Sequence, residues 1–226
     1  MNPIDEAQAR AFLTARGKNH VIGWSMAPEE ACEFFKQQGK TVLTFIGYSM
    51  DYEDQPGMFQ TVREVLSRYS PETTLVNIGA TEGGLGEVYS LAKSLGFITT
   101  GIVSTQALSH PEYISEAVEH VCFIRDESWG GKLASGELTP TSQAMVMSSD
   151  VLVGIGGGPI SRDELLAGKA LGKPVIFYPA EIGHEAAIRR AEWRGLPVPT
   201  SFWGEAHEVF APLPETRQIY KKILGE

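Results

Sequence analysis

Short, continuous apolar runs alternate with amphipathic segments through the middle of this chain, and no other feature restricts its fold as much. The runs do not alternate between apolar and polar residues, which is typical of parallel strands that are covered on both faces. The segments between the runs carry apolar stripes at helical spacing. This alternation predicts an α/β fold with a doubly wound, mostly parallel sheet and helices on both faces. We expect strands at residues 41–47, 74–78, 97–103, 120–124, 151–155 and 174–178.

Both ends of the chain differ in pattern from this core. Residues 195–214 contain four prolines and predict an irregular connection to a final helix. The helices expected outside the core lie near residues 5–15, 28–38 and 215–224. No linker or repeat separates the parts, so we expect one domain over residues 1–226. Its expected parts are an N-terminal helical cover at 1–40, the core at 41–195 and a C-terminal extension at 196–226.

The composition excludes several classes of partner. The chain has 226 residues, 42% of them hydrophobic, and a formal net charge of −9. That charge opposes nonspecific binding to nucleic acid or to anionic membranes, but a few local amides suffice for a small phosphorylated ligand. No apolar run approaches the roughly 20 residues that cross a bilayer, and we expect no signal peptide. The two cysteines, Cys32 and Cys122, lack metal-ligand spacing, so we expect buried thiols in a reducing cytoplasm.

Two glycine-rich turns follow predicted strands and lead toward predicted helices. Gly156, Gly157 and Gly158 come after the run 151–155, and a second turn at 79–86 follows an earlier run. Glycine has no Cβ, so a ligand can approach the backbone, and the first turn of a helix offers unpaired N–H groups to an anion. Ligands of open α/β sheets bind beyond the carboxyl ends of the strands, so we expect a nucleotide-type pocket there. Its candidate residues are Gly47, Tyr48, Ser49, Gly79, Thr81, Glu82, Gly83, Gly84, Leu85, Gly86, Gly156, Gly157, Gly158, Pro159, Ile160, Ser161 and Arg162.

Each candidate also has a purely structural interpretation. Ser161 and Glu164 match the Ser-x-x-Glu capping box that closes a helix N-terminus. Arg162 could be an exposed helix charge, Glu82 could face solvent, and the glycines could serve tight turns alone. Arg125, at a strand end, could pair with the acidic residues that follow it or bind a ligand. The sequence leaves these alternatives open.

Several catalytic patterns are absent from the sequence. Pro159 replaces the last glycine of the Gly-x-Gly-x-x-Gly dinucleotide fingerprint. There is no Gly-x-x-x-x-Gly-Lys-Ser/Thr phosphate loop and no Gly-x-Ser-x-Gly nucleophile elbow. The five histidines have no mutual spacing for a metal or a catalytic triad. We therefore predict neither a metal site nor a cofactor.

The stretch 149–164 resembles the signature of the LOG-like family, whose members were long described as "possible lysine decarboxylases". The family belongs to a wider Rossmann-like superfamily that includes the DNA-processing protein DprA. Its signature is a strand that ends in Pro-Gly-Gly-x-Gly-Thr-x-x-Glu. Gly157, Gly158 and Glu164 fall on matching positions, and Ser161 stands for the threonine.

The resemblance spans roughly residues 41–180 and includes the earlier glycine turn and the Tyr48-Ser49 loop. It implies a Rossmann-like sheet, a homodimer and nucleotide binding. Enzymes of the family hydrolyse the N-glycosidic bond of nucleoside 5′-monophosphates and release the base and ribose 5-phosphate. By resemblance, Glu164 stabilises the cationic sugar or activates water.

The sequence departs from the family pattern at several positions. The family's arginine–lysine pair falls near Thr141 and Ser142, which are not basic, and the methionine after it corresponds to Met145. Ile160 stands in place of a glycine, and Gly156 in place of the leading proline. The candidates to replace the lost arginine are Arg125, Lys132 and Arg162.

Two functions follow from these observations. The first is a nucleotide-processing enzyme that cleaves an N-glycosidic bond, with Glu164 and Arg125 as catalytic residues and Met145 in the nucleotide site. The second is a noncatalytic binder or carrier of a nucleotide-derived signal or phosphorylated cofactor, which the loss of the basic pair favours. In both, the partner is a small nucleotide or sugar phosphate, bound by a cytoplasmic homodimer, and not nucleic acid or a membrane.

Overall fold

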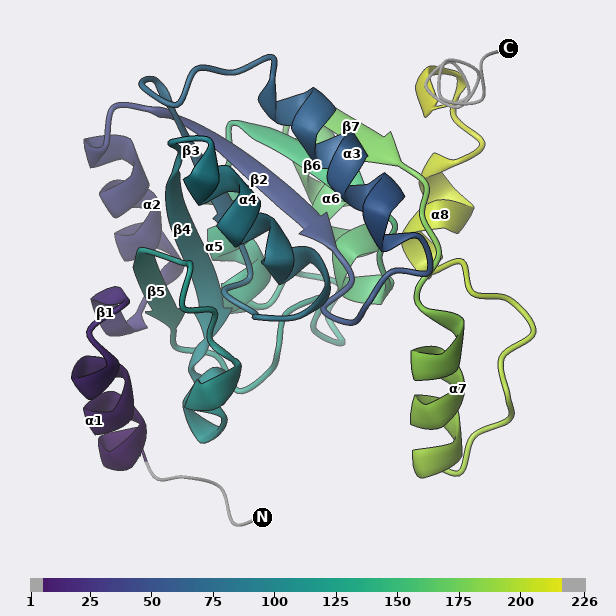
Figure 1. The fold of residues 1–226 in the computed structure, drawn as a ribbon, viewed down its shortest axis with the longest axis horizontal. Helices are drawn as coiled ribbons and strands as arrows, with labels where there is room; N and C mark the ends of the chain where they lie inside the picture. Colours follow the sequence, from purple (N-terminus) through teal and green to yellow (C-terminus); the bar gives the residue numbers. More distant parts are fainter. Residues whose placement is uncertain (1–5, 217–226) are drawn as a thin grey trace.

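The computed structural model describes residues 6–216, which contain a seven-stranded sheet. The strands cross the sheet in the order β1-β5-β4-β3-β2-β6-β7, and every neighbouring pair is parallel. Helices cover both faces (Figure 1), so the predicted doubly wound α/β fold is confirmed. The strands are β1 (His20–Met26), β2 (Thr41–Gly47), β3 (Thr74–Ile78), β4 (Ile98–Ser104), β5 (His120–Ile124), β6 (Val151–Ile155) and β7 (Val175–Tyr178).

The buried core lies in two layers, one on each face of the sheet. Side chains of β2 alternate between them: Leu43 and Phe45 pack into one layer, and Val42 and Ile46 face the other way. Residues on both faces of β2 are therefore buried, and they include one polar residue, Thr44, which accepts a hydrogen bond from the Ser149 hydroxyl at 2.6 Å. The first layer is covered by α1 (Glu6–Arg16), α3 (Gln55–Leu66) and α4 (Val88–Ser94), and the second by α2 (Pro28–Gln37), α5 (Pro140–Ser148) and α6 (Pro159–Ala170).

The direction in which the chain adds strands reverses at β2. From β2 the chain steps outward through β3, β4 and β5, and then crosses back through α5 to β6 on the other side of β2. β2 and β6 pair from Leu43 and Val151 to Gly47 and Ile155, so the two strands end side by side. The helices that follow them, α3 and α6, lie on opposite faces. Such a reversal is where open α/β sheets bind ligands.

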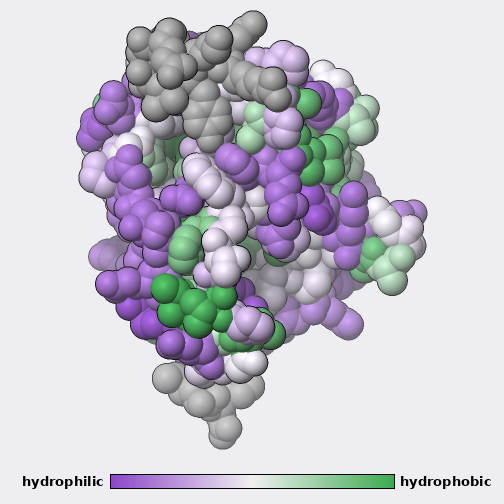
Figure 2. Space-filling view, turned by 90° about the vertical axis from the view of Figure 1, so that its right-hand side faces the viewer, coloured by the Kyte–Doolittle hydropathy of each residue, from purple (hydrophilic) through white to green (hydrophobic). Residues whose placement is uncertain are grey.

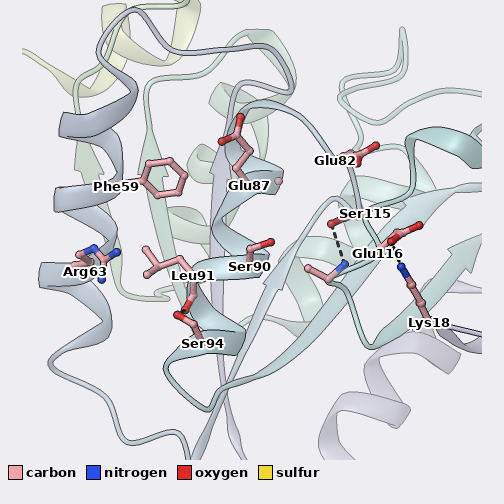
Figure 3. Close-up of a pocket in the computed structure, with 12 residues that line it drawn as sticks. Lys18, Phe59, Arg63, Glu82, Glu87, Ser90, Leu91, Ser94, Ser115 and Glu116 are labelled. Atoms are coloured by element: carbon pink, nitrogen blue, oxygen red, sulfur yellow. Dashed lines mark hydrogen bonds and ion pairs between the residues drawn. The ribbon is translucent and has the colours of Figure 1, made fainter.

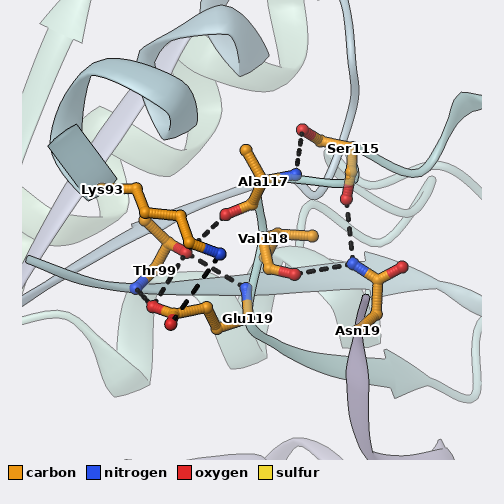
Figure 4. A network of polar contacts seen from close by, with 7 residues as sticks. All are labelled: Asn19, Lys93, Thr99, Ser115, Ala117, Val118 and Glu119. Atoms are coloured by element: carbon orange, nitrogen blue, oxygen red, sulfur yellow. Dashed lines mark hydrogen bonds and ion pairs between the residues drawn. The ribbon is translucent and has the colours of Figure 1, made fainter. Parts of the chain in front are cut away.

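Residues 20–26 form an edge strand between the two helices of the N-terminal region 1–40, where the sequence predicts helices and no strand. β1 pairs with β5 in an irregular register, with shifts on both sides of Gly23. The Trp24 ring stacks on Phe123, with 5.5 Å between the ring centroids, and so anchors the strand to the sheet. Just before β1, the Asn19 amide donates hydrogen bonds to the carbonyl oxygens of Ser115 and Val118, at 2.9 and 2.6 Å (Figure 4).

The C-terminal region is more regular than predicted. Residues 195–214, expected to be irregular, include the short helix α8 (Glu205–Phe210), whose Phe210 ring packs near Phe177 of β7. Before it, α7 (His184–Trp193) buries none of its residues and stands off the sheet (Figure 1). On the side that carries α7 and α8, hydrophobic residues form small groups among hydrophilic ones (Figure 2). The helix expected at 215–224 falls largely on residues outside the described range.

Three 3-10 turns complete the architecture at the carboxyl edge of the sheet. They are η1 (Gly84–Glu87), η2 (Thr105–Ser109) and η3 (Pro111–Tyr113). Between residues 6 and 216, no helix is both long and apolar enough to cross a bilayer.

Candidate functional site

The loops after β2 and β6 are held together at the strand reversal. The Ser161 hydroxyl, in the first turn of α6, donates a hydrogen bond to the Gly47 carbonyl at 3.1 Å. The Tyr52 hydroxyl donates to the Ile155 carbonyl at 2.9 Å and accepts from the Tyr48 N–H at 3.1 Å. These bonds fix the ends of both strands, so the predicted residues after β2 and β6 do come together.

Two of the three glycines after β6 are required by the turn itself. Gly156 and Gly157 have φ angles of +55° and +118°, which L side chains rarely adopt. A Cβ on Gly156 would lie 2.5 Å from Tyr48 Cε2, and one on Gly157 would lie 2.4 Å from Ser161 Cβ. Gly158 differs, because the nearest atom to its Cβ position is Oε2 of Glu205, at 3.6 Å. Gly158 therefore leaves its backbone open to a small ligand.

The first turn of α6 presents unpaired amides beside this open glycine. Gly158 is the N-cap and supplies no side-chain acceptor. The N–H groups of Gly158, Ile160 and Ser161 find no acceptor within residues 6–216. The Ser161 hydroxyl is bound to Gly47 and the Glu164 carboxylate to Ser142, so the two do not form the capping box that their spacing suggests. Free amides at the positive end of a helix dipole favour an anion.

The glycine turn after β3 lies against the loop at 48–50. Gly84 has φ +58°, and a Cβ there would lie 2.5 Å from the Met50 carbonyl oxygen. Gly86 is equally restricted, since its Cβ would meet the Thr81 carbonyl oxygen at 1.9 Å. The Leu85 N–H donates to the Tyr48 carbonyl at 2.9 Å. The two glycine turns therefore flank the same loop.

Two glycines of this second turn are open. Nothing lies within 4 Å of a Cβ built on Gly79, and only the Ser49 carbonyl oxygen, at 3.5 Å, approaches one on Gly83. Ser49 is itself exposed. Glycines of both turns thus divide into those that the backbone needs and those that leave space above it.

Tyr48 closes one side of the β6 turn. Its buried ring packs on Gly156, and its hydroxyl donates to the Ala180 carbonyl at 3.3 Å and accepts from the Gly204 N–H at 2.8 Å. Burial raises the pKa of Tyr48. The Ala206 N–H of α8 donates to the Gly157 carbonyl at 3.1 Å. The segment that begins α8 is thereby fastened to the glycine turn.

Glu164 lies beneath a loop and not in an open pocket. Glu164 is only 6% exposed, and this burial raises the pKa of its carboxyl to about 7. Ser142 Oγ donates to Glu164 Oε1 at 2.7 Å and accepts from the Gly131 N–H at 2.7 Å. A Cβ on Gly130 would lie 3.8 Å from the same carboxylate oxygen. The loop after β5 therefore covers Glu164, and Ser142 joins that loop to the carboxylate.

The predicted cations are distributed in two places. Arg125 is exposed and hydrogen-bonds to Ser25 of β1, with Nε 3.2 Å from Ser25 Oγ, so it pairs with neither of the acidic residues after it. Arg162 and Lys132 instead share Asp163, with Arg162 Nη2 at 2.9 Å and Lys132 Nζ at 3.7 Å from Asp163 Oδ1. The structure brings these two cations, and not Arg125, beside the residue that precedes Glu164.

Met145 and Glu82 lie at the margins of the predicted site. Met145 is buried in α5, and its Sδ accepts a hydrogen bond from Asn77 Nδ2 at 3.1 Å. Glu82 is exposed, as one alternative proposed, and lines a groove of about 780 Å³ together with Gly86 and Arg63 (Figure 3). The groove runs between α3, α4 and the loop at 115–117, away from the β6 turn.

Acidic and hydroxyl residues that were not among the predicted site residues organise the loop after β5. Asp126 accepts hydrogen bonds from the Thr141 N–H at 2.9 Å and from Ser128 at 2.8 Å. Burial acts to raise the pKa of Asp126, but these donors outweigh it and lower the pKa. The signal was present as Asp126-x-Ser128, the spacing of a turn in which the aspartate accepts from its own neighbours. No group of residues suited to hold a metal ion occurs in the described part of the chain.

Comparisons with known proteins bear on the fold alone. No protein-family model matches the chain, and no curated protein matches it. The chain is similar to two solved structures of the molybdenum cofactor carrier protein from Chlamydomonas reinhardtii. The first is 19% identical in sequence, with a TM-score of 0.43, and the alignment covers 82% of this chain and 98% of the chain in that structure. The other is 18% identical with a TM-score of 0.46 and covers 83% and 99%. A third, the protein TM1055, is 20% identical with a TM-score of 0.41 and covers 60% and 72%.

Proposed function

We propose that this protein binds a small phosphorylated ligand, a nucleotide or a phosphorylated cofactor, with the phosphate at the N-terminus of α6. The observation that carries the proposal is the open Gly158 beside the unpaired N–H groups of Ile160 and Ser161. These amides lie where β2 and β6 end side by side, at the strand reversal. Backbone amides and the helix dipole together stabilise a phosphate there.

The charges around this turn act in both directions. Oε2 of Glu205 lies 3.6 Å from the Cβ position of Gly158, so its negative charge opposes a phosphate there, while two cations favour one. Arg162, in the first turns of α6, and Lys132, in the loop after β5, both form ion pairs with Asp163. A phosphate can recruit either cation at short range, and this local attraction does not depend on the net charge of the chain.

Binding without catalysis is the function that the geometry supports best. Glu164 is covered by the loop after β5, and Arg125 is held by Ser25 on β1. The second candidate is hydrolysis of the N-glycosidic bond of a nucleoside monophosphate. Its support is the pKa of about 7 for Glu164, since a carboxyl group that titrates near neutrality can act as a general acid or base. A homodimer and a cytoplasmic location complete the proposal.

Replacing Gly158 with aspartate tests the phosphate site without unfolding the helix. Gly158 has φ −87° in the extended region of an N-cap, where aspartate is preferred. The new carboxylate would occupy the free amides and raise the stability of the fold by about 0.3–1 kcal/mol. We expect it to weaken the binding of AMP and ribose 5-phosphate by about tenfold or more, as measured by calorimetry.

The matched control places the same charge at the other end of the same helix. Leu171, which is exposed, is replaced with aspartate, and binding should not change. Unchanged affinity of Gly158→Asp, in a protein that binds AMP, would contradict the proposed phosphate site. Chromatography of the nucleotide after incubation separates the two candidate functions, because a binder returns it intact and a hydrolase releases free base that is lost in Glu164→Gln.

A further inference from the structure

The four tryptophans of the chain have different surroundings. Trp24 stacks on Phe123, and Trp203 stacks on His207 with 4.1 Å between the ring centroids. Three of them are exposed: Trp203 by 39%, Trp129 by 55% and Trp193 by 84%. Of these three, only Trp203 contacts another ring, and neither the Trp129 nor the Trp193 indole contacts a ring or a cation within the described residues. Covering an exposed aromatic ring with a partner removes apolar area from water and is favourable.

Of the two tryptophans without a ring partner, only Trp129 belongs to a loop that lies against the first turn of α6. It belongs to the loop after β5 and directly precedes Gly130. A Cβ on Gly130 would lie 3.2 Å from Ile160 Cγ2 and 3.8 Å from Glu164 Oε1. The backbone next to Trp129 thus touches the first turn of α6, whose amides are free. Trp193 is at the end of α7, which stands off the sheet (Figure 1).

The loop that carries Trp129 is fixed on both sides of the indole. The Ser128 N–H is bound to Asp126 at 2.8 Å, and the Gly131 N–H is bound to Ser142 at 2.7 Å. The Thr139 N–H closes the loop by donating to the Gly131 carbonyl at 2.8 Å. A ring held on such a loop loses little conformational freedom when a ligand stacks on it.

We infer that Trp129 is the platform on which a planar ring of the bound ligand stacks, so that the ligand is a phosphorylated molecule with an aromatic heterocycle. The inference rests on the proposed function, because the amides of α6 hold the phosphate. Trp129 determines specificity: it separates a nucleotide from the sugar phosphate that lacks the ring. The base binds through its π-face, which every nucleobase presents.

A pair of matched ligands tests the inference. AMP and ribose 5-phosphate share the phosphate and the sugar and differ only in the ring, and calorimetry gives the affinity of each for the full chain. We expect the wild type to prefer AMP. Trp129→Ala should lower the affinity for AMP by about 5- to 150-fold, the range for loss of one stacked base. The affinity for ribose 5-phosphate should not change. Trp129→Phe should retain part of the preference for AMP over ribose 5-phosphate. Trp193→Ala, the matched control, should retain all of it.

Tryptophan fluorescence supplies a second readout that folding alone does not move. AMP, but not ribose 5-phosphate, should quench the emission, and Trp129→Phe should abolish the quenching while its melting temperature stays that of the wild type. Equal wild-type affinities for the two ligands, or a Trp129→Ala variant that keeps the preference for AMP, would overturn the stacking role and leave the phosphate site standing. Absence of binding for both ligands would overturn the proposed function and the stacking role together.

Discussion

The two glycine turns look alike in sequence and differ in what they offer a ligand. The turn after β6 leads into α6, a twelve-residue helix whose first N–H groups have no acceptor within residues 6–216. The turn after β3 leads into the four-residue η1, where the N–H groups of Leu85 and Gly86 are bound to the carbonyls of Tyr48 and Gly83, while those of Gly83 and Gly84 find no acceptor within the described residues. Both turns therefore have free amides, but only the turn after β6 is followed by a helix long enough to add the positive end of a dipole.

The largest effects on stability should come from the glycines that have a positive φ and no room for a Cβ, which we call closed. Both turns contain such glycines. Gly157→Ala and Gly84→Ala each place a Cβ at a positive φ, within 2.4 Å of Ser161 and 2.5 Å of Met50 respectively. We expect each to lower the free energy of unfolding by about 2–5 kcal/mol, measured by chemical denaturation. A wild-type unfolding curve for either variant would show that its turn tolerates a side chain, and the division into closed and open glycines would fail.

A pH-dependent effect of middle size should distinguish the two turns. Burial raises the pKa of Glu164 from 4.5 to about 7, so the folded state holds a proton that the unfolded state releases between these values. Its contribution to stability is fully present below pH 4.5 and is lost as the pH rises toward 7, a difference of about 3 kcal/mol. Glu164→Gln should remove this loss and be the more stable protein at pH 8.

The control for this titration is Glu82→Gln in the other turn, where the side chain is exposed. Denaturation curves from pH 4 to pH 8 compare both variants with the wild type. The same decline with pH in Glu164→Gln as in the wild type would mean that Glu164 is ionised in the folded protein.

The smallest effects on stability should come from the open glycines. Gly158 and Gly83 have φ angles of −87° and −90°, which alanine adopts freely. Replacing either with alanine should therefore change the free energy of unfolding by no more than about 0.5 kcal/mol. Only Gly158→Ala should lower the affinity for AMP, by a few-fold, because the new methyl group would lie over the free amides. Equal losses of affinity in the two variants would show that both turns hold the ligand.

Most of the sheet could be predicted because its strands are buried on both faces. Four strands have the predicted bounds, and β4 and β7 begin one residue later, at Ile98 and Val175. β1 lacks a continuous apolar run and is held by tertiary contacts such as Trp24 on Phe123. Neighbouring-residue patterns contain no sign of such contacts. The same holds for α8, a six-residue helix fastened by the Gly157 carbonyl.

The candidate site was predictable as a place and not as a set of contacts. The strand ends and glycine turns could be located because parallel strands present their carboxyl ends at one edge. Which glycines are open depends on side chains far away in sequence, such as Tyr48 against Gly156. Likewise, Arg125 is bound to Ser25 on the strand that the sequence did not predict, so its distance from Glu164 could not be foreseen.

The pairing of β1 has a consequence for the order in which the molecule is assembled. His20 lies opposite His120, so the two partners are separated by 100 positions of chain. The chain must therefore be synthesised through β5 before β1 can pair at the rim of the sheet. Bringing such distant segments together is slow compared with local pairing. A chain stopped before β5 would thus leave β1 without its neighbour in the sheet.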